Sequence, residues 1–568
     1  MLSFALKSAR VFLTPRKAAP PIRKNLAFLK PYLRRLHWTS TMCSSASPPS
    51  PLVAVKEKIE LTEAEEKIFR RLLDVVRHFK LPTQLRVAGG WVRDKLLGKE
   101  SKDIDIALDD MLGREFCEKI NQYLDFMGEE TRDIGVIQCN PDQSKHLETA
   151  TMPVFDMRID FVNLRSETYA ENSRIPTMKF GTAEEDAYRR DLTINSLFYN
   201  INNNSIEDLT GRGIQDLKSG IIETPLPPKS TFLDDPLRVL RAIRFGARFD
   251  FSLDEELQKA AADEEVKAAI GFKISRERIG HEVNLMISGN RPIKAVTYIC
   301  DLQLFWVVFS LPQNHDVALS ERCDRLSVAY MDAAWKSLQL IGYSIFNDEQ
   351  RRLYLYASLF FPLKNKETYS TKKSKKVPLS SYVILNSLKL KVSDAETVLR
   401  LHNAAERFTS LITFLASDEN SKIVDLELEG ENFDVSHSSR KRILTGLLLH
   451  QIKDYWRVAL LLSTLLYPNI DSAEDFMDRE FDLEKSREIY FSVMNAINKM
   501  GLKDVWKLKP LLNGNDIMKI LQLKNGGPQI REWQQKVLKW QLAHPDGTAE
   551  ECEEWIMQTL AKRVKLSD

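Results

Sequence analysis

The segment from residue 86 to residue 108, RVAGGWVRDKLLGKESKDIDIAL, constrains the fold more than any other stretch of this chain. Its first residues predict a strand over 85–88 that turns, through a pair of glycines, into a helix beginning near Trp91. Apolar and other residues then alternate over 103–108, which is the spacing of a second strand. A strand, a glycine turn, a helix and a second strand therefore predict part of a small mixed α/β domain.

The glycine pair, Gly89 and Gly90, stands where the first strand turns into the helix. Glycines at such a turn let backbone N–H groups approach an anion closely, and a phosphate is the natural occupant. A Gly-Gly pair by itself is more often a plain turn, so the pair needs support from neighbouring residues.

That support comes from Asp103 and Asp105, which are two residues apart on the second strand and so point to the same side. Two such carboxylates repel each other unless a cation bridges them, and hard oxygen ligands suit Mg²⁺. A lone Asp-x-Asp is usually a solvated strand edge. Beside a phosphate turn, the pair predicts phosphoryl or nucleotidyl transfer with two metal ions.

The rest of the chain predicts an α+β protein. Residues 57–80 have helical spacing, and residues 146–165 give further strands. After 207–220 the strand patterns largely give way to long helical patterns, so a mixed-sheet head is followed by an all-helical remainder. With 43% hydrophobic residues, a chain of 568 residues can bury the cores of about three or four domains.

Composition excludes several classes of protein. The net charge is +2 from 81 basic and 79 acidic residues, so nucleic-acid affinity must come from charge placed locally. Six scattered cysteines show no disulfide framework and no C-x-x-C spacing, which favours a reducing compartment. No stretch approaches the roughly twenty apolar residues that cross a bilayer, and LFWVVFSL at 304–311 reads as core. The nine histidines show no zinc-ligand spacing.

The two ends of the chain carry targeting patterns. Residues 1–56 are basic and contain no acid, which is typical of an organellar transit peptide. Initiation at Met42 would give the same protein without that address, so one gene could supply several compartments. The ending AKRVKLSD at 561–568 resembles a monopartite nuclear import signal, with a solvated basic end as the alternative. Lysine-rich 364–376 is predicted to be an exposed loop.

Residues 89–98, with Asp103-Ile104-Asp105 after them, resemble the first motif of the class II tRNA nucleotidyltransferases, the CCA-adding enzymes of the polymerase-β superfamily. The motif sequences are most similar to those of eukaryotic, plant-like members of the family, and further motifs follow in the family's order to about residue 290. The resemblance implies an enzyme that adds CCA to tRNA 3′ ends, with CTP and ATP as substrates and Mg²⁺ as cofactor. We expect no association with a membrane and infer no obligate protein partner. The resemblance implies five parts: a transit peptide and flexible N-terminus (1–56), a nucleotidyltransferase head (57–205), a helical neck (206–300), a helical body (301–500) and a tRNA-binding tail (501–568).

The resemblance also assigns roles to residues. Asp103 and Asp105 are the catalytic metal ligands, with Asp160 or Glu148 as candidates for a third carboxylate. The second motif, Arg189 to Asn195, implies that Arg190 clamps phosphate and that Asp191 accepts from the ribose 2′-hydroxyl, which agrees with the chemistry of both groups. The nucleotide-binding set is Gly89, Gly90, Arg93, Arg190, Asp191, Asp235 and Arg238.

The fourth motif, in residues 234–249, implies how the base is selected. Pro236 suits the first turn of a helix, which would put Asp235 and Arg238 on one face. Cytosine and adenine both present an amine donor beside a ring acceptor, so one carboxylate and one guanidinium can satisfy either base. Guanine and uracil present the opposite pattern and would leave polar groups unpaired, at about 1–3 kcal/mol each.

Other motif residues leave alternatives open. Asp234 stands where the family commonly has Glu, in a position to orient Arg238. Further along the same helix, three arginines could reach phosphates or the RNA end, or could form salt bridges: Arg241, Arg244 and Arg248. Residues 208–217 match a connector motif, and 275–287 match a fifth motif to which we assign structural work through Glu277, Arg278 and Glu282, with His281 on the helix surface.

In the tail, the turn from Lys524 to Gly527 could bind an RNA phosphate or be a packing turn, while Trp533 and Trp540 are expected in the core.

Three rival functions remain at this point. A poly(A) polymerase would share the head motifs and use ATP alone. The second rival is an enzyme that adds only CC or only the last A, because the loop at 109–147 could control the switch from adding C to adding A. The third is a catalytically silent RNA-binding protein, which the intact motif residues disfavour.

Overall fold

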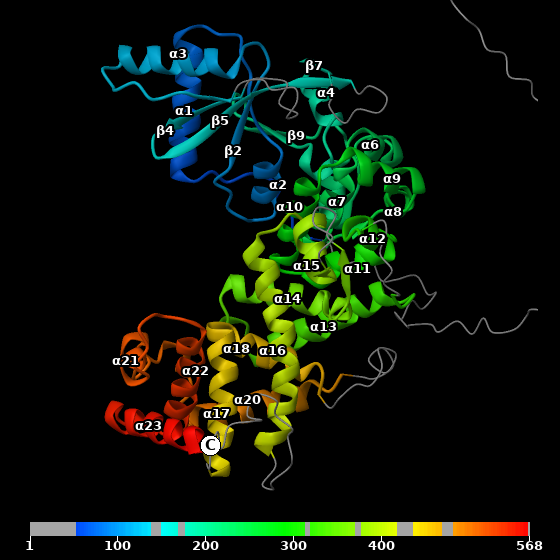
Figure 1. Ribbon diagram of the computed structural model, residues 1–568. Helices are drawn as coiled ribbons and strands as arrows, with labels where there is room; N and C mark the ends of the chain where they lie inside the picture. The colour runs from blue at the N-terminus through cyan, green and yellow to red at the C-terminus, as the bar shows by residue number, and fades with distance from the viewer. Residues whose placement is uncertain are drawn as a thin grey trace, which may run out of the picture. The chain divides into compact units, whose positions relative to one another are not determined.

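The computed structural model describes residues 53–137, 149–168, 177–312, 319–369, 376–416, 436–467 and 481–565 (Figure 1). Several predicted features lie outside these residues: nearly all of the transit peptide, Met42, Glu148, and the end of the basic stretch 561–568. The described residues belong to one compact unit, which runs from Pro51 to Asp568.

The head is built on a seven-stranded mixed sheet with strand order β3-β4-β5-β2-β1-β8-β9. Its strands are β1 (Leu85–Ala88), β2 (Ile104–Leu108), β3 (Gly135–Ile137), β4 (Thr149–Val154), β5 (Met157–Asn163), β8 (Phe198–Asn200) and β9 (Ser205–Glu207). A hairpin of β6 (Arg165–Thr168) and β7 (Thr177–Phe180) stands beside it, and the helices are α1 (Glu63–His78), α2 (Gly90–Leu96), α3 (Gly113–Phe126) and α4 (Ala183–Tyr188). In the sheet, β2 and β5 are the parallel pair, whereas the other pairs are antiparallel. The predicted α+β class and both strands of the opening segment are confirmed.

The two faces of this sheet differ. Ile104, Ile106 and Leu108 point into the main hydrophobic core, which also contains the apolar sides of α1 and α3. Ala107 points the other way, into a small cluster with Phe198. Since side chains alternate along a strand, Asp103 and Asp105 share the second face with Ala107. The two motif carboxylates are thus kept out of the main core.

The neck is helical, with one short parallel strand pair. Its elements are α5 (Gly213–Ser219), β10 (Ile221–Ile222), α6 (Pro228–Asp234), α7 (Leu237–Phe249), β11 (Ser252–Leu253), α8 (Glu255–Ala261), α9 (Glu264–Lys273), α10 (Arg276–Ile287) and α11 (Pro292–Asp301). Helix α7 packs against α10 and α11. Near its N-terminal end, Arg238 donates to the backbone carbonyl of Arg189 in the head. The helix therefore carries side chains from the neck toward the head.

The body consists of α12 (Phe305–Val308), α13 (Cys323–Ile341), α14 (Asp348–Leu359), α15 (Leu379–Tyr382), a π-helical turn (Val383–Ser387), α16 (Val392–Ala416), α17 (His437–Ile452), α18 (Trp456–Thr464) and α20 (Leu483–Lys499). The prediction that 364–376 is a plain exposed loop is wrong at its ends. Strands β12 (Glu367–Tyr369) and β13 (Lys376–Pro378) pair there, and the side chain of Thr368 is buried. The lysine-rich composition predicted an exposed segment and gave no indication of this strand pair or of the buried Thr368.

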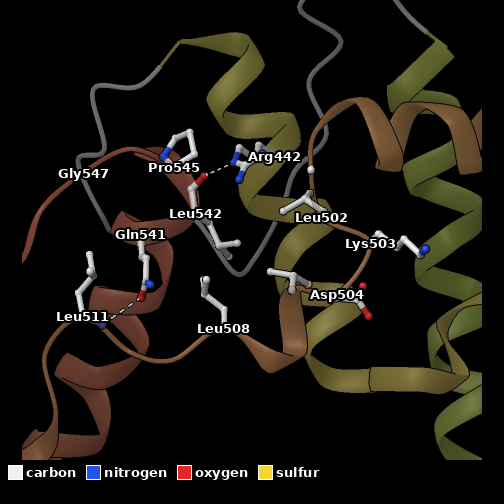
Figure 2. Close-up of a pocket in the computed structure, with 12 residues that line it drawn as sticks. Arg442, Leu502, Lys503, Asp504, Leu508, Leu511, Gln541, Leu542, Pro545 and Gly547 are labelled. Carbon is white, nitrogen blue, oxygen red and sulfur yellow. Dashed lines mark hydrogen bonds between the residues drawn. The ribbon is translucent and has the colours of Figure 1, made fainter.

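The tail has a small core of its own. Helices α21 (Gly514–Ile520), α22 (Pro528–Ala543) and α23 (Ala549–Lys565) enclose buried side chains that include Trp533 and Trp540, as the sequence predicts. At the junction with the body, Arg442 of α17 donates from Nε to the Leu542 carbonyl at 2.8 Å (Figure 2). A cavity of about 310 Å³ lies beside that contact.

No helix in the described part of the chain combines the length and apolarity needed to cross a membrane. Residues 304–311 contribute buried side chains to the core, as predicted. The four cysteines within the described residues, Cys117, Cys300, Cys323 and Cys552, are buried free thiols.

Candidate active site

The glycine turn brings the second motif against the first. Gly89 has a φ of 69°, and a Cβ added to it would lie 2.6 Å from Nη1 of Arg190. The N–H of Gly89 donates to the Leu197 carbonyl at 2.9 Å, so that donor is occupied within the sheet. At Gly90, helix α2 begins without a side-chain cap, which leaves its first N–H groups for another acceptor.

The two motif carboxylates have a third beside them. Asp105 and Asp160 are register partners on the parallel strands β2 and β5, and alternation puts them on the same face. Burial, together with the charges of Asp103 and Asp160, raises the pKa of Asp105 to about 6, against an opposing effect of Arg190. Within the described residues, no three acidic, histidine or cysteine side chains already converge as a complete set of metal ligands.

Asp186, which the sequence reasoning missed, organises the arginine pair. Arg190 donates twice to Oδ2 of Asp186, at 3.0 and 2.8 Å, while Arg189 donates to Oδ1 at 2.8 and 2.6 Å. Burial alone would raise the pKa of Asp186, but Arg190 and Arg189 lower it. Nη1 of Arg190 reaches the Asn195 carbonyl at 3.3 Å, beside the glycine turn. The guanidinium is thus fixed where a phosphate on that turn would meet it.

Asp191 is buried, and both of its carboxylate oxygens accept hydrogen bonds. Its Oδ2 accepts from Nε of Arg241 at 2.7 Å, and its Oδ1 accepts from Nδ2 of Asn195 at 3.0 Å. Burial would raise the pKa of Asp191, but the charge of Arg241 and the hydrogen bond from Asn195 lower this pKa to about 2. The carboxylate is therefore held ionised as an acceptor.

The two residues expected to select the base lie at the start of α7. Asp235 is extended and precedes the cap residue Pro236, and its carbonyl accepts from the N–H of Arg238 at 3.0 Å, so Asp235 and Arg238 stand three residues apart at one turn. Oδ2 of Asp235 accepts from Nη2 of Arg278 at 3.1 Å. Arg238 is buried and donates from Nη2 to the Arg189 carbonyl at 2.7 Å. The two groups are held by separate partners.

Glu167 of the β6–β7 hairpin links these arginines. Its carboxylate lies 3.0 Å from Arg189 and 3.9 Å from Arg238. Asp234 is close enough for Arg238 to lower its pKa, but burial is the larger effect and raises it. Local spacing gave no signal for Glu167 and only a structural role for Arg278, because each acts on a residue far away in the sequence.

Arg93 lies inside the protein between head and neck. Its guanidinium pairs with Asp94 at 2.8 Å and donates to Oδ1 of Asn195. It also lies over the rings of Phe245 and Phe249, 4.9 and 4.8 Å from their centres. Burial lowers the pKa of Arg93, and the charge of Asp94 opposes that effect. These contacts tie the first motif to α7.

The other arginines of α7 form salt bridges within the protein, which the sequence offered as the alternative to contacts with phosphates or the RNA end. Besides the pair of Arg241 with Asp191, Arg244 pairs with Glu282 at 2.6 Å and Arg248 with Asp94 at 3.3 Å. Glu282 of the fifth motif is therefore structural, as predicted.

Paired carboxylates on a mixed sheet, facing a fixed arginine beside a glycine turn, define a nucleotidyltransferase head. In agreement, residues 85–223 match the family described as the poly A polymerase head domain. Over 89% of its length the chain is 35% identical to the mitochondrial CCA tRNA nucleotidyltransferase of Candida glabrata, covering 97% of that protein. It is 34% identical to the mitochondrial enzyme of Saccharomyces cerevisiae, over 87% of this chain and 92% of that protein. A solved apo structure of a CCA-adding enzyme has the same fold, with a TM-score of 0.57 at 19% identity over 88% of this chain and 96% of the other. The chain belongs to the CCA tRNA nucleotidyltransferase family.

Proposed function

We propose that this enzyme completes tRNA 3′ ends by adding C, C and A from CTP and ATP, without a nucleic-acid template. The observation that carries the proposal is the pair Asp235 and Arg238, one carboxylate and one guanidinium that are each held by a protein partner. One acceptor and one donor suit the amine and ring nitrogen of cytosine and of adenine. Selection by fixed side chains needs no template base.

Asp103 and Asp105 are the proposed ligands of Mg²⁺, with Asp160 as the third carboxylate. The fit is supported by Asp105, whose pKa is raised to about 6 by burial and by its two acidic neighbours, because an unbalanced negative charge favours a bound cation. Oxygen donors of this kind suit Mg²⁺. When bound, the metal would lower the pKa of the primer 3′-hydroxyl and offset the charge of the leaving pyrophosphate.

The remaining roles follow from the contacts. Arg190 would bind the triphosphate at the turn of Gly89 and Gly90, and Asp191 would accept from the ribose 2′-hydroxyl. Arg93 would act on the nucleotide through Asn195, whose amide it fixes. Tail residues around Lys524 would hold the body of the tRNA, since they are exposed before α22.

Primer extension tests this function. The full chain and Mg²⁺ are incubated with tRNAs ending before CCA, after C and after CC, with each labelled nucleotide offered singly and together. Addition of C, C and A followed by arrest is the expected result. Long A tails would indicate a poly(A) polymerase, addition of only CC or only A would indicate a partial enzyme, and no addition to any primer would contradict the proposal.

For localisation, we propose that the chain begun at Met1 enters the mitochondrion, with the plastid as a second candidate. Chains begun at Met42 would serve the cytoplasm and the nucleus. The support is the basic, acid-free composition of 1–56, and two relatives described as mitochondrial. A fluorescent reporter fused to residues 1–56 should enter mitochondria, and a cytosolic reporter would contradict this address.

A further inference from the structure

A cavity of about 330 Å³ lies where the loop after α2 meets α7, the end of α10 and the segment leading into α11. We call it the basic cavity. Its cationic walls come from the head and from the neck, and its floor is apolar. The lining residues used below are Lys99, Arg244, Arg248, Leu285 and Arg291.

Positive charge exceeds negative charge around the basic cavity. Three carboxylates are each shared or paired: Glu282 with Arg244, Asp94 with Arg93 and Arg248, and Asp250 with Arg291 and Lys294. Lys99 makes no ion pair with another described residue, and its Nζ lies 4.8 Å from the centre of the Phe249 ring. The side chains of Arg248 and Arg291 are 46% and 53% exposed. An anion would find several accessible donors there.

The position of the basic cavity separates it from the nucleotide site. Arg238 is near the N-terminal end of α7 and Arg248 near its C-terminal end, so about ten residues, or roughly 15 Å along the axis, lie between them. Lys99, however, belongs to the loop that leads directly into Asp103. The cavity therefore lies at the other end of α7 from Arg238, and Lys99 connects it along the chain to Asp103.

We propose that the basic cavity binds a backbone phosphate of the RNA primer, close to the 3′ end that is being extended. This inference rests on the proposed function. Arginine and lysine side chains that remain accessible are the usual partners of RNA phosphates, and such contacts position a chain without reading its sequence. The exposed Leu285 provides an apolar surface for the adjoining sugar.

The test uses two pairs of variants of the full chain. Lys99→Gln removes the unpaired cation, and Lys259→Gln removes an exposed cation on α8, where it pairs with Glu256, as the charge-matched control. Leu285→Glu places a negative charge on the cavity floor, and Leu285→Gln is its neutral control of the same shape. Binding of labelled tRNA lacking CCA is measured by fluorescence anisotropy without nucleotides, over a range of salt concentrations. The KM values for tRNA and for CTP are measured separately.

We expect Lys99→Gln and Leu285→Glu to weaken tRNA binding about three- to tenfold, and Lys99→Gln to reduce the slope of log K against log salt by about one. Lys259→Gln should bind like wild type, Leu285→Gln should weaken binding less than Leu285→Glu does, and the KM for CTP should not change in any variant.

Three results would overturn the inference. A raised KM for CTP with unchanged tRNA binding would mean that the cavity holds phosphates of the free nucleotide. Unchanged binding in all four variants, or no tRNA binding by wild type, would mean that it holds no RNA. Wild type that binds tRNA but extends none would contradict the proposed function alone.

Discussion

The site depends on acids that its motifs do not contain. Asp186 fixes both motif arginines, and Glu167 links Arg189 to Arg238. The sequence predicts Asp103, Asp105 and Arg190 because each chemical group stands in a short motif with a recognisable spacing. It could not predict Glu167, because that residue meets its partners only after β6 and β7 pair and α7 packs beneath them.

Asp105→Asn should stabilise the metal-free protein and abolish nucleotide addition. Burial and the charges of Asp103 and Asp160 raise the pKa of Asp105 from 3.8 to about 6. Between these values the folded state binds more protons than the unfolded chain, so the free energy of unfolding falls as the pH rises. Above pH ~6 the ionised group costs about 3 kcal/mol.

We therefore expect Asp105→Asn to raise the melting temperature in EDTA at pH 8, and to raise it much less at pH 4, where wild-type Asp105 is protonated. Mg²⁺ should raise the melting temperature of wild type more than that of the variant. A variant less stable than wild type at pH 8 would show that the carboxylate is balanced by the protein itself.

Arg278 is expected to position the base-reading carboxylate. Its Nη2 lies 3.1 Å from Oδ2 of Asp235, so Arg278→Gln would let that carboxylate turn away from the base. The ratio of CTP to UTP incorporation into tRNA lacking CCA should fall by about tenfold, a change of about 1.4 kcal/mol. Arg278→Lys, which keeps the charge, should recover part of the ratio. An unchanged ratio in both variants would limit Arg278 to the structural work that the fifth motif predicts.

At the scale of elements, local patterns predicted most of what formed. The helix expected over 57–80 begins at Glu63 because Thr62 caps it with Glu65, and the strands at 85–88 and 104–108 end where predicted. Contacts between elements were not predictable. Arg276 of α10 donates to the carbonyls of Ser387, Val307 and Val308, which hold the neck against the body. No residue spacing in 275–287 reveals that contact.

Gly280→Ala should weaken this contact between α10 and the π-helical turn. A Cβ on Gly280 would lie 1.7 Å from the Leu388 carbonyl oxygen, so one backbone must move. We expect a loss of about 1–3 kcal/mol in the free energy of unfolding, measured by urea denaturation. Gly271→Ala in α9 is the matched control, because its Cβ would meet nothing within 4 Å and should be neutral or stabilising by up to about 1 kcal/mol. Equal stabilities for the two variants would contradict this packing.

For the whole molecule, the order of parts was predictable but their cores were not. The sequence predicts a head followed by helices, since periodicity changes after 207–220. In the structure one continuous core runs through the head, neck and body, whereas the tail encloses a separate one. Which apolar faces join depends on contacts between residues far apart in the chain, and the tail joins the body where α22 packs on α17, through buried residues that include Leu502, Val505, Leu542 and Ala543.

Gly446→Val in α17 should loosen the tail without affecting catalysis. A Cβ on Gly446 would lie 2.5 Å from Cδ2 of Leu542, a buried side chain of α22, so the larger residue pushes α22 away. Because the tail has its own core, we expect it to stay folded and to become sensitive to protease at the linker 501–511. The KM for tRNA should rise several-fold while the KM for CTP stays unchanged. Gly514→Ala, whose Cβ would make ordinary contacts at 3.4 and 3.6 Å, should leave both constants unchanged. If Gly446→Val left the KM for tRNA unaltered while the linker became sensitive, the position of the tail would not govern how the enzyme holds its RNA.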